Sequence, residues 1–215
     1  MNKIIIIYNQ KESNKKALVF VPGFSGGLSV PIISRIISHF NELETYDVFG
    51  LNLDYQDDVI DAFENSQKMI IDNIREIKES FPEKKIFLIA KSLGGLLCFY
   101  NLDTLSVNGL VILGSSIKLG WPQRISLLSM NNPTIPDYIS EWKSFFQQHK
   151  TPVHIISGSS DDLTDNSFLQ SISRQNEYIG LRILDKANHD LINIQDGTLY
   201  LKECVEEIKN FVEYI

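Results

Sequence analysis

The stretch FLIAKSLGG, at residues 87–95, decides the fold of this 215-residue chain. An unbroken apolar run ends at Ala90, two polar residues follow, and two glycines lead into the apolar segment LLCFYNL. A short apolar run of this kind is typical of a strand that is buried on both faces, and the segment after it has the character of a buried helix. The sequence therefore predicts a strand that turns directly into a helix at Ser92.

The rest of the chain repeats this alternation of apolar strands and amphipathic helices. Strands are predicted at residues 3–8, 17–21, 47–53, 85–90, 109–113, 153–157 and 180–184. Helices are predicted at residues 31–40, at 59–79 and from 201 to the end. The pattern indicates an α/β fold with a mostly parallel central sheet and helices on both faces. We expect one domain over residues 1–215, with a short lid-like or helical segment at about 115–150.

The charge of the chain argues against two classes of partner. Its 27 Asp and Glu residues exceed its 20 Lys and Arg residues, which gives a net charge of −7. No basic stripe with interleaved aromatic residues stands out, and an acidic surface repels phosphate backbones and anionic membranes. We therefore expect neither nucleic acid nor a membrane as a partner.

The cysteines and the N-terminus bear on the compartment. Cys98 and Cys204 both lie in apolar helical patterns, which favours buried free thiols in a reducing compartment, although either thiol could be reactive. The run of four isoleucines from Ile4 to Ile7 is too short for a signal peptide or a membrane span. The prediction is a cytoplasmic protein.

Two serines compete for the role of a nucleophile. The stretch GFSGG at residues 23–27 is the literal match to G-x-S-x-G, yet the strand before it ends at Pro22 and the next helix begins only near residue 30. At Ser92 the helix begins at once, and the residues two before and two after, Ala90 and Gly94, are small enough for a tight turn. We interpret Ser92 as the nucleophile and Ser25 as a loop residue.

Ser92 has two other possible roles. It could be an ordinary polar residue at a helix start. The pair Lys91–Ser92 also resembles the end of a phosphate-binding loop, but Ala90 and Lys85 stand where that motif needs glycine. The phosphate-binding interpretation is rejected.

A serine nucleophile needs a general base, and histidine is the usual one. His39 falls inside a predicted helix, His149 precedes a strand and His154 lies within one. Only His189, in DKANHDL, follows a strand and precedes a helix. An exposed turn histidine is the alternative, but the loops at the carboxyl ends of parallel strands are where α/β proteins place their chemistry. His189 is the candidate base.

The carboxylate that orients the base is expected in SGSSDDLTD, the loop after the strand at 153–157. Asp161 and Asp162 are adjacent, so only one of them can reach His189. Either of them, or Asp165, could instead cap the following helix.

Together these residues resemble the α/β-hydrolase family over essentially the whole chain. The order Ser92, Asp161, His189 is that family's order of nucleophile, acid and base. The resemblance also selects Asp161 over Asp162, because family loops of the form G-x-x-D place the acid three residues after a glycine, here Gly158. Two departures are Ala90, where the family usually has glycine, and Pro22, where it commonly has histidine.

The resemblance implies a serine hydrolase that cleaves a small-molecule carboxylic ester through an acyl-enzyme, with no cofactor and no metal ion. It places the oxyanion hole at the backbone N–H groups of Phe24 and Leu93. Thioesters, lactones and small amides are alternative substrates. A catalytically inactive binding protein of the same fold is the alternative function, while a nucleotide-binding protein is disfavoured because no G-x-G-x-x-G follows an early strand.

Seven of the large apolar residues in the segment at about 115–150 either line an acyl pocket or pack a helix on the sheet. They are Trp121, Leu127, Leu128, Met130, Trp142, Phe145 and Phe146.

Overall fold

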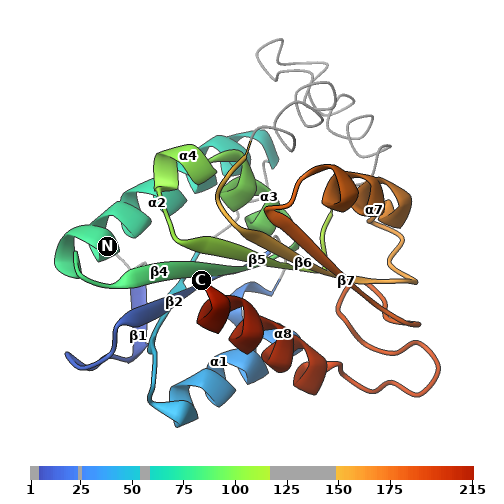
Figure 1. Cartoon of the computed structure of the whole chain (residues 1–215), viewed down its shortest axis with the longest axis horizontal. Helices are drawn as coiled ribbons and strands as arrows, with labels where there is room; N and C mark the ends of the chain where they lie inside the picture. The colour runs from blue at the N-terminus through green and yellow to red at the C-terminus, as the bar shows by residue number, and fades with distance from the viewer. Residues whose placement is uncertain (1–4, 24–25, 54–58, 117–148) are drawn as a thin grey trace.

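The computed structural model describes residues 5–23, 26–53, 59–116 and 149–215, which Figure 1 draws as a coloured ribbon. They form a seven-stranded sheet with helices on both sides (Figure 1). The strands are β1 (Ile5–Asn9), β2 (Lys16–Val21), β3 (Asp47–Leu51), β4 (Lys85–Lys91), β5 (Gly109–Leu113), β6 (Val153–Gly158) and β7 (Ile179–Leu184). The helices are η1 (Gly27–Ser29), α1 (Pro31–Leu43), α2 (Val59–Ser80), α3 (Ser92–Tyr100), α4 (Leu102–Leu105), α7 (Asn166–Gln175) and α8 (Leu201–Tyr214).

The sheet has the strand order β1-β3-β2-β4-β5-β6-β7. β1 pairs with β3 antiparallel, and every other neighbouring pair is parallel. Six strands, β3, β2, β4, β5, β6 and β7, therefore have their carboxyl ends at one edge of the sheet. The predicted α/β class and mostly parallel sheet are confirmed.

Alternate residues of the central strands enter two separate cores. Along β4, Ile86, Leu88 and Ala90 belong to the core beneath α2, α3 and α7, whereas Phe87 and Ile89 belong to the core beneath α1 and α8. Figure 1 shows α1 and α8 together on one face and the other labelled helices on the opposite face. Both faces are buried under helices, which is why the strand reads as continuously apolar.

The structure adds elements that the sequence patterns did not predict. α4 has only four residues, and α7 buries only Leu169 and Ile172, so neither gives a long apolar periodicity. Asp165 caps α7, because its side chain accepts a hydrogen bond of 3.0 Å from the Phe168 N–H. Most of the predicted lid-like segment, residues 117–148, lies outside the described residues, and so do the seven large apolar residues named above.

The amino edge of the sheet is held by polar contacts. Asp47, at the start of β3, is fully buried and accepts hydrogen bonds from the Lys11 N–H at 3.0 Å, from Asn14 Nδ2 at 3.0 Å and from the Lys84 ammonium. The end of α8 is tied to the same edge, since Lys16 Nζ donates to the Val212 carbonyl at 2.7 Å. These contacts stabilise the amino edge of the sheet, whereas the predicted site residues follow strands at the opposite, carboxyl edge.

Candidate active site

Ser92 stands on a strained turn between β4 and α3. The strand ends at Lys91 and the helix begins at Ser92, with no intervening loop. Ser92 has a φ of +49°, in the left-handed region, which costs a non-glycine residue about 1–3 kcal/mol. Strain of this size persists only where the surrounding fold enforces it. This is the sharp turn that the sequence predicts for a nucleophile.

Two glycines make the turn possible. A Cβ on Gly94 would lie 2.2 Å from the Pro22 carbonyl oxygen, and a Cβ on Gly95 would lie 2.6 Å from Ile112 Cγ2. Any larger residue would push α3 away from β2 and β5. Ala90, where glycine is more usual, is fully buried and is accommodated within the strand.

The loop after β2 lies against the same turn. A Cβ on Gly23 would lie 3.2 Å from Ser92 Cβ and 3.2 Å from the Lys91 carbonyl oxygen. The next residue, Phe24, is the predicted oxyanion-hole donor, and with Ser25 it lies outside the described residues. The other predicted donor, Leu93, is buried in the first turn of α3, where backbone N–H groups lack partners within the helix.

His189 bridges the predicted nucleophile and the predicted acid. Its Nε2 lies 2.8 Å from Ser92 Oγ, and its Nδ1 lies 2.9 Å from Asp161 Oδ2. An ionised carboxylate can only accept, so the Nδ1 proton is donated to Asp161 and Nε2 can accept the Ser92 hydroxyl proton. The Asp161 side chain is completely buried, and the His189 side chain is 18% exposed. The structure thus brings together Ser92, from the β4–α3 turn, with Asp161 and His189, from two separate loops.

Asp161 is fixed by two further hydrogen bonds. Its Oδ1 accepts from the Leu163 N–H at 2.8 Å, and its Oδ2 lies 3.0 Å from Thr164 Oγ1. The single proton of the Thr164 hydroxyl is shared between Asp161 and a second acceptor, the carbonyl oxygen of Ser115, just after β5. Asp162 is exposed, so of the two adjacent carboxylates the structure places only Asp161 on the histidine.

Sequence reasoning missed Thr164. Its position three residues after Asp161 is a spacing at which serine and threonine side chains often bond to nearby groups. That pattern is common in loops, so by itself it does not distinguish a residue of the site from an ordinary turn.

The acid and base loops approach each other because Gly158 has no side chain. A Cβ there would lie 2.1 Å from the Ala187 carbonyl oxygen and 2.7 Å from that of Asn188. The contact is completed by hydrogen bonds from the Ser160 N–H to the Ala187 carbonyl at 2.9 Å and from the Lys186 N–H to Ser159 Oγ at 2.7 Å. The glycine of the predicted G-x-x-D loop therefore sets the spacing between acid and base.

The other histidines and the two thiols lie elsewhere. His39 is in α1 and His154 is in β6, where its Nε2 lies 2.9 Å from Glu207 Oε2. Cys98 and Cys204 are free and buried; burial raises the pKa of the Cys98 thiol, and burial together with nearby glutamates raises the pKa of Cys204 to about 12. Burial therefore disfavours the reactive thiolate form of both residues.

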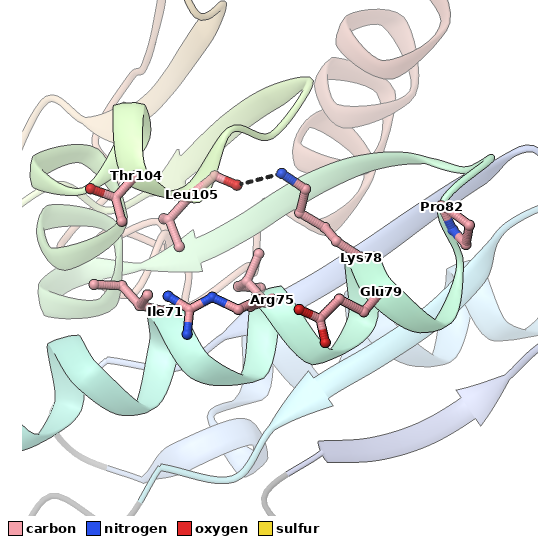
Figure 2. A pocket seen from close by; sticks show the side chains of 8 residues that line it. Ile71, Arg75, Lys78, Glu79, Pro82, Thr104 and Leu105 are labelled. Carbon is pink, nitrogen blue, oxygen red and sulfur yellow. Dashed lines mark hydrogen bonds between the residues drawn. The ribbon is translucent and has the colours of Figure 1, made fainter.

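A pocket of about 390 Å³ lies between α2 and α4 (Figure 2). Lys78 crosses it and donates hydrogen bonds to the carbonyl oxygens of Leu105 at 3.1 Å and Ser106 at 2.9 Å, which satisfies the end of α4. Pro82, also in its wall, precedes the amino end of β4, so the pocket lies at the opposite end of that strand from Ser92.

The described residues offer neither a membrane-spanning helix nor a metal site. No helix among them is long and apolar enough to cross a membrane. Within the same ranges, no three His, Cys, Asp or Glu side chains are grouped so that they could hold a metal ion.

The sequence matches no protein-family model and no curated protein. The folded chain is nevertheless similar to solved structures. An esterase from Butyrivibrio proteoclasticus with ferulic acid bound is 14% identical, with a TM-score of 0.71 over 98% of this chain and 94% of that one. An esterase from Pyrococcus furiosus is 17% identical, with a TM-score of 0.69 over 94% and 82% of the two chains. An α/β serine hydrolase without a lid, from Xanthomonas campestris, is 10% identical, with a TM-score of 0.64 over 98% and 88%. The chain has the α/β-hydrolase fold, as the sequence predicts.

Proposed function

We propose that this protein is a serine hydrolase that cleaves carboxylic esters through an acyl-enzyme on Ser92. The observation that carries the proposal is the unbroken hydrogen-bonded chain from Ser92 Oγ through the His189 ring to Asp161. A hydroxyl on a strained turn, a base within reach and a buried carboxylate behind the base are the parts that nucleophilic catalysis by serine requires. The esterases among the similar structures support the same reaction class.

In the first half of the reaction, Ser92 Oγ attacks the ester carbonyl carbon while His189 Nε2 accepts the hydroxyl proton. The imidazolium so formed keeps its Nδ1–H directed at Asp161, whose negative charge stabilises it. His189 then donates the Nε2 proton to the departing alkoxide, which leaves as the alcohol. The acyl group remains bonded to Ser92.

In the second half, water replaces the alcohol. His189 Nε2 removes a proton from the water as its oxygen attacks the acyl carbon, and then returns that proton to Ser92 Oγ. The carboxylic acid leaves and the resting enzyme is restored. No step requires a cofactor or a metal ion.

The oxyanion of each tetrahedral intermediate needs N–H donors close to Ser92. Leu93 supplies one in this proposal, at the amino end of α3, where the helix dipole also favours negative charge. Phe24 supplies the other, supported by the position of its neighbour Gly23 against the turn.

We further propose a small-molecule acyl substrate and a cytoplasmic location. The buried free thiols support a reducing compartment. Thioesters, lactones and small amides pass through the same tetrahedral intermediate, so the substrate class must be measured.

Hydrolysis of p-nitrophenyl esters with acyl chains of increasing length tests the proposal directly, with an acyl-coenzyme A series run alongside. Wild type should turn over at least one series, and Ser92→Ala should lower kcat by about 10⁶-fold. A folded wild type that turns over neither series would contradict the proposal and favour the inactive binding protein.

A further inference from the structure

Lys91, directly before Ser92, is a buried cation at the site that the reaction proposed above does not use. Its side chain is 4% exposed, although lysine is almost never fully buried without a partner. Burial lowers the pKa of the Lys91 ammonium, and the nearby Asp190 and Asp161 carboxylates partly oppose this effect. A side-chain amine that is buried to this extent needs polar partners.

The compensating interaction is with the loop that carries the predicted base. Lys91 Nζ donates a hydrogen bond of 2.8 Å to the backbone carbonyl of His189 itself. It also lies 3.5 Å from Asp190 Oδ1, on a side chain that is 55% exposed. Both partners belong to one loop, and the hydrogen bond joins residues 98 positions apart in the sequence.

The end of β5 leaves room for this contact. Gly114 follows β5 with a φ of +57°, and a Cβ there would lie 2.3 Å from the His189 carbonyl oxygen and 2.9 Å from Lys91 Nζ. Any other residue at this position would collide with both partners of the hydrogen bond. The glycine that follows β5 thus leaves the space that the Lys91–His189 hydrogen bond needs.

Resting on the proposed function, we infer that Lys91 is a positioning residue that sets His189 in line with Ser92. The backbone of Lys91 leads into the turn that presents the serine, and its ammonium holds the backbone of the histidine. One residue thereby connects the nucleophile and the base and fixes their relative position. Lys91 does not contact the reacting atoms in this account, so it acts through His189.

The test compares Lys91→Met with Lys84→Met. Methionine keeps a long apolar stem and removes the ammonium in both variants. Lys84 is a suitable control because it is also a paired lysine with a largely buried side chain, 9% exposed, and it bonds to Asp47 at the opposite edge of the sheet. We expect Lys91→Met to lower kcat on a p-nitrophenyl ester by about 10- to 100-fold with KM changed by less than about threefold, the effect of losing one hydrogen bond to a charged group. Lys84→Met should lower the denaturation midpoint and leave the kcat of the folded fraction unchanged.

Lys91→Arg provides a rescue, because arginine retains a cationic donor; we expect it to recover more activity than Lys91→Met. A folded Lys91→Met with wild-type kcat would overturn the inference. If Lys91→Met does not fold, the exposed variant Asp190→Ala replaces it, and a drop in kcat of about threefold is expected because the ammonium loses one of its two partners on the loop. Wild-type kcat in Asp190→Ala would then assign Lys91 to folding alone.

The labelling of wild type by a fluorophosphonate separates this inference from the proposed function. A wild type that is not labelled at Ser92 contradicts the proposed function. A wild type that is labelled, with Lys91→Met labelled at the same rate, contradicts only the positioning role.

Discussion

The Thr164 hydroxyl lies 3.0 Å from Asp161 Oδ2, the same oxygen that accepts from His189 Nδ1. The Thr164 hydroxyl, the Asp161 carboxylate and the His189 imidazole therefore form one hydrogen-bonded chain behind Ser92. Because Thr164 also reaches the Ser115 carbonyl after β5, the chain connects the acid loop to the neighbouring strand end. The orientation of the predicted base depends on residues from three loops.

Thr164→Val should weaken this orientation. Valine has nearly the same shape but cannot donate a hydrogen bond, so the buried carboxylate loses a partner. We expect kcat/KM for an ester to fall by about tenfold, which corresponds to one hydrogen bond to a charged group. Thr164→Ser keeps the hydroxyl and should stay within about threefold of wild type. Equal rates for the valine variant and wild type would show that Thr164 does not support Asp161.

The two adjacent aspartates should differ sharply in their effect. Asp161→Asn removes the charge that stabilises the imidazolium and permits the wrong histidine tautomer, so kcat should fall by about 10⁴-fold. Asp162→Asn changes an exposed neighbour and should leave kcat within about twofold. Steady-state kinetics of both variants measure the contrast. A larger loss in Asp162→Asn would reassign the acid.

Asp47→Asn should destabilise the fold while leaving catalysis intact. The substitution removes the counter-charge of the largely buried Lys84 ammonium, which keeps the Lys11 carbonyl as a partner, so the expected cost is about 3 kcal/mol, the low end for a buried pair. Urea denaturation measures this loss, and kcat of the folded protein should not change because Asp47 lies at the amino edge. The matched control is Glu44→Gln, which breaks an exposed ion pair with Lys11 and should not shift the urea midpoint measurably. A similar midpoint for the two variants would contradict the structural role of Asp47.

The fold should lose stability in alkali partly through Cys204. Its thiol has an ordinary pKa of 9.0 and a folded pKa of about 12. Between these values the unfolded chain binds fewer protons than the folded chain, so the free energy of unfolding falls as the pH rises, by up to about 1.4 kcal/mol per pH unit for this group. The lowered pKa of Lys91 has the opposite effect on the free energy of unfolding. Lys91 is present in wild type and in a Cys204 variant alike, so its effect cancels when the two are compared.

Cys204→Ala tests this prediction. Urea denaturation between pH 7 and pH 11 should give a flatter decline above pH 9 in the variant than in wild type. Below pH 8 the two curves should run parallel, offset by the packing change. Parallel curves over the whole range would show that the thiol does not contribute to the loss.

The sequence predicted the strands well because their chemistry is local. The apolar run before Ser92 and the helix after it agree with β4 and α3 to within one residue. The antiparallel pairing of β1 with β3 was not predicted, since apolar content says nothing about strand direction. α7 was missed because its ten residues bury only Leu169 and Ile172.

The residues of the candidate site also fall into those that the sequence predicts and those that it does not. Ser92, Asp161 and His189 each follow a recognisable strand, so their convergence at one edge could be expected from a parallel sheet. The contacts of Thr164 and Lys91 could not be expected, because each depends on the direction of one side chain across loops that are far apart in the sequence. Catalysis by the three predicted residues stays a prediction until activity is measured.

The most direct test of the central claim is intact-mass spectrometry after treatment with a fluorophosphonate. Wild type, Ser92→Ala and Ser25→Ala should be compared, since Ser25 belongs to the literal G-x-S-x-G match. The account predicts a single adduct on wild type and on Ser25→Ala, and none on Ser92→Ala. An adduct that persists in folded Ser92→Ala, or a folded wild type that forms none, would contradict it.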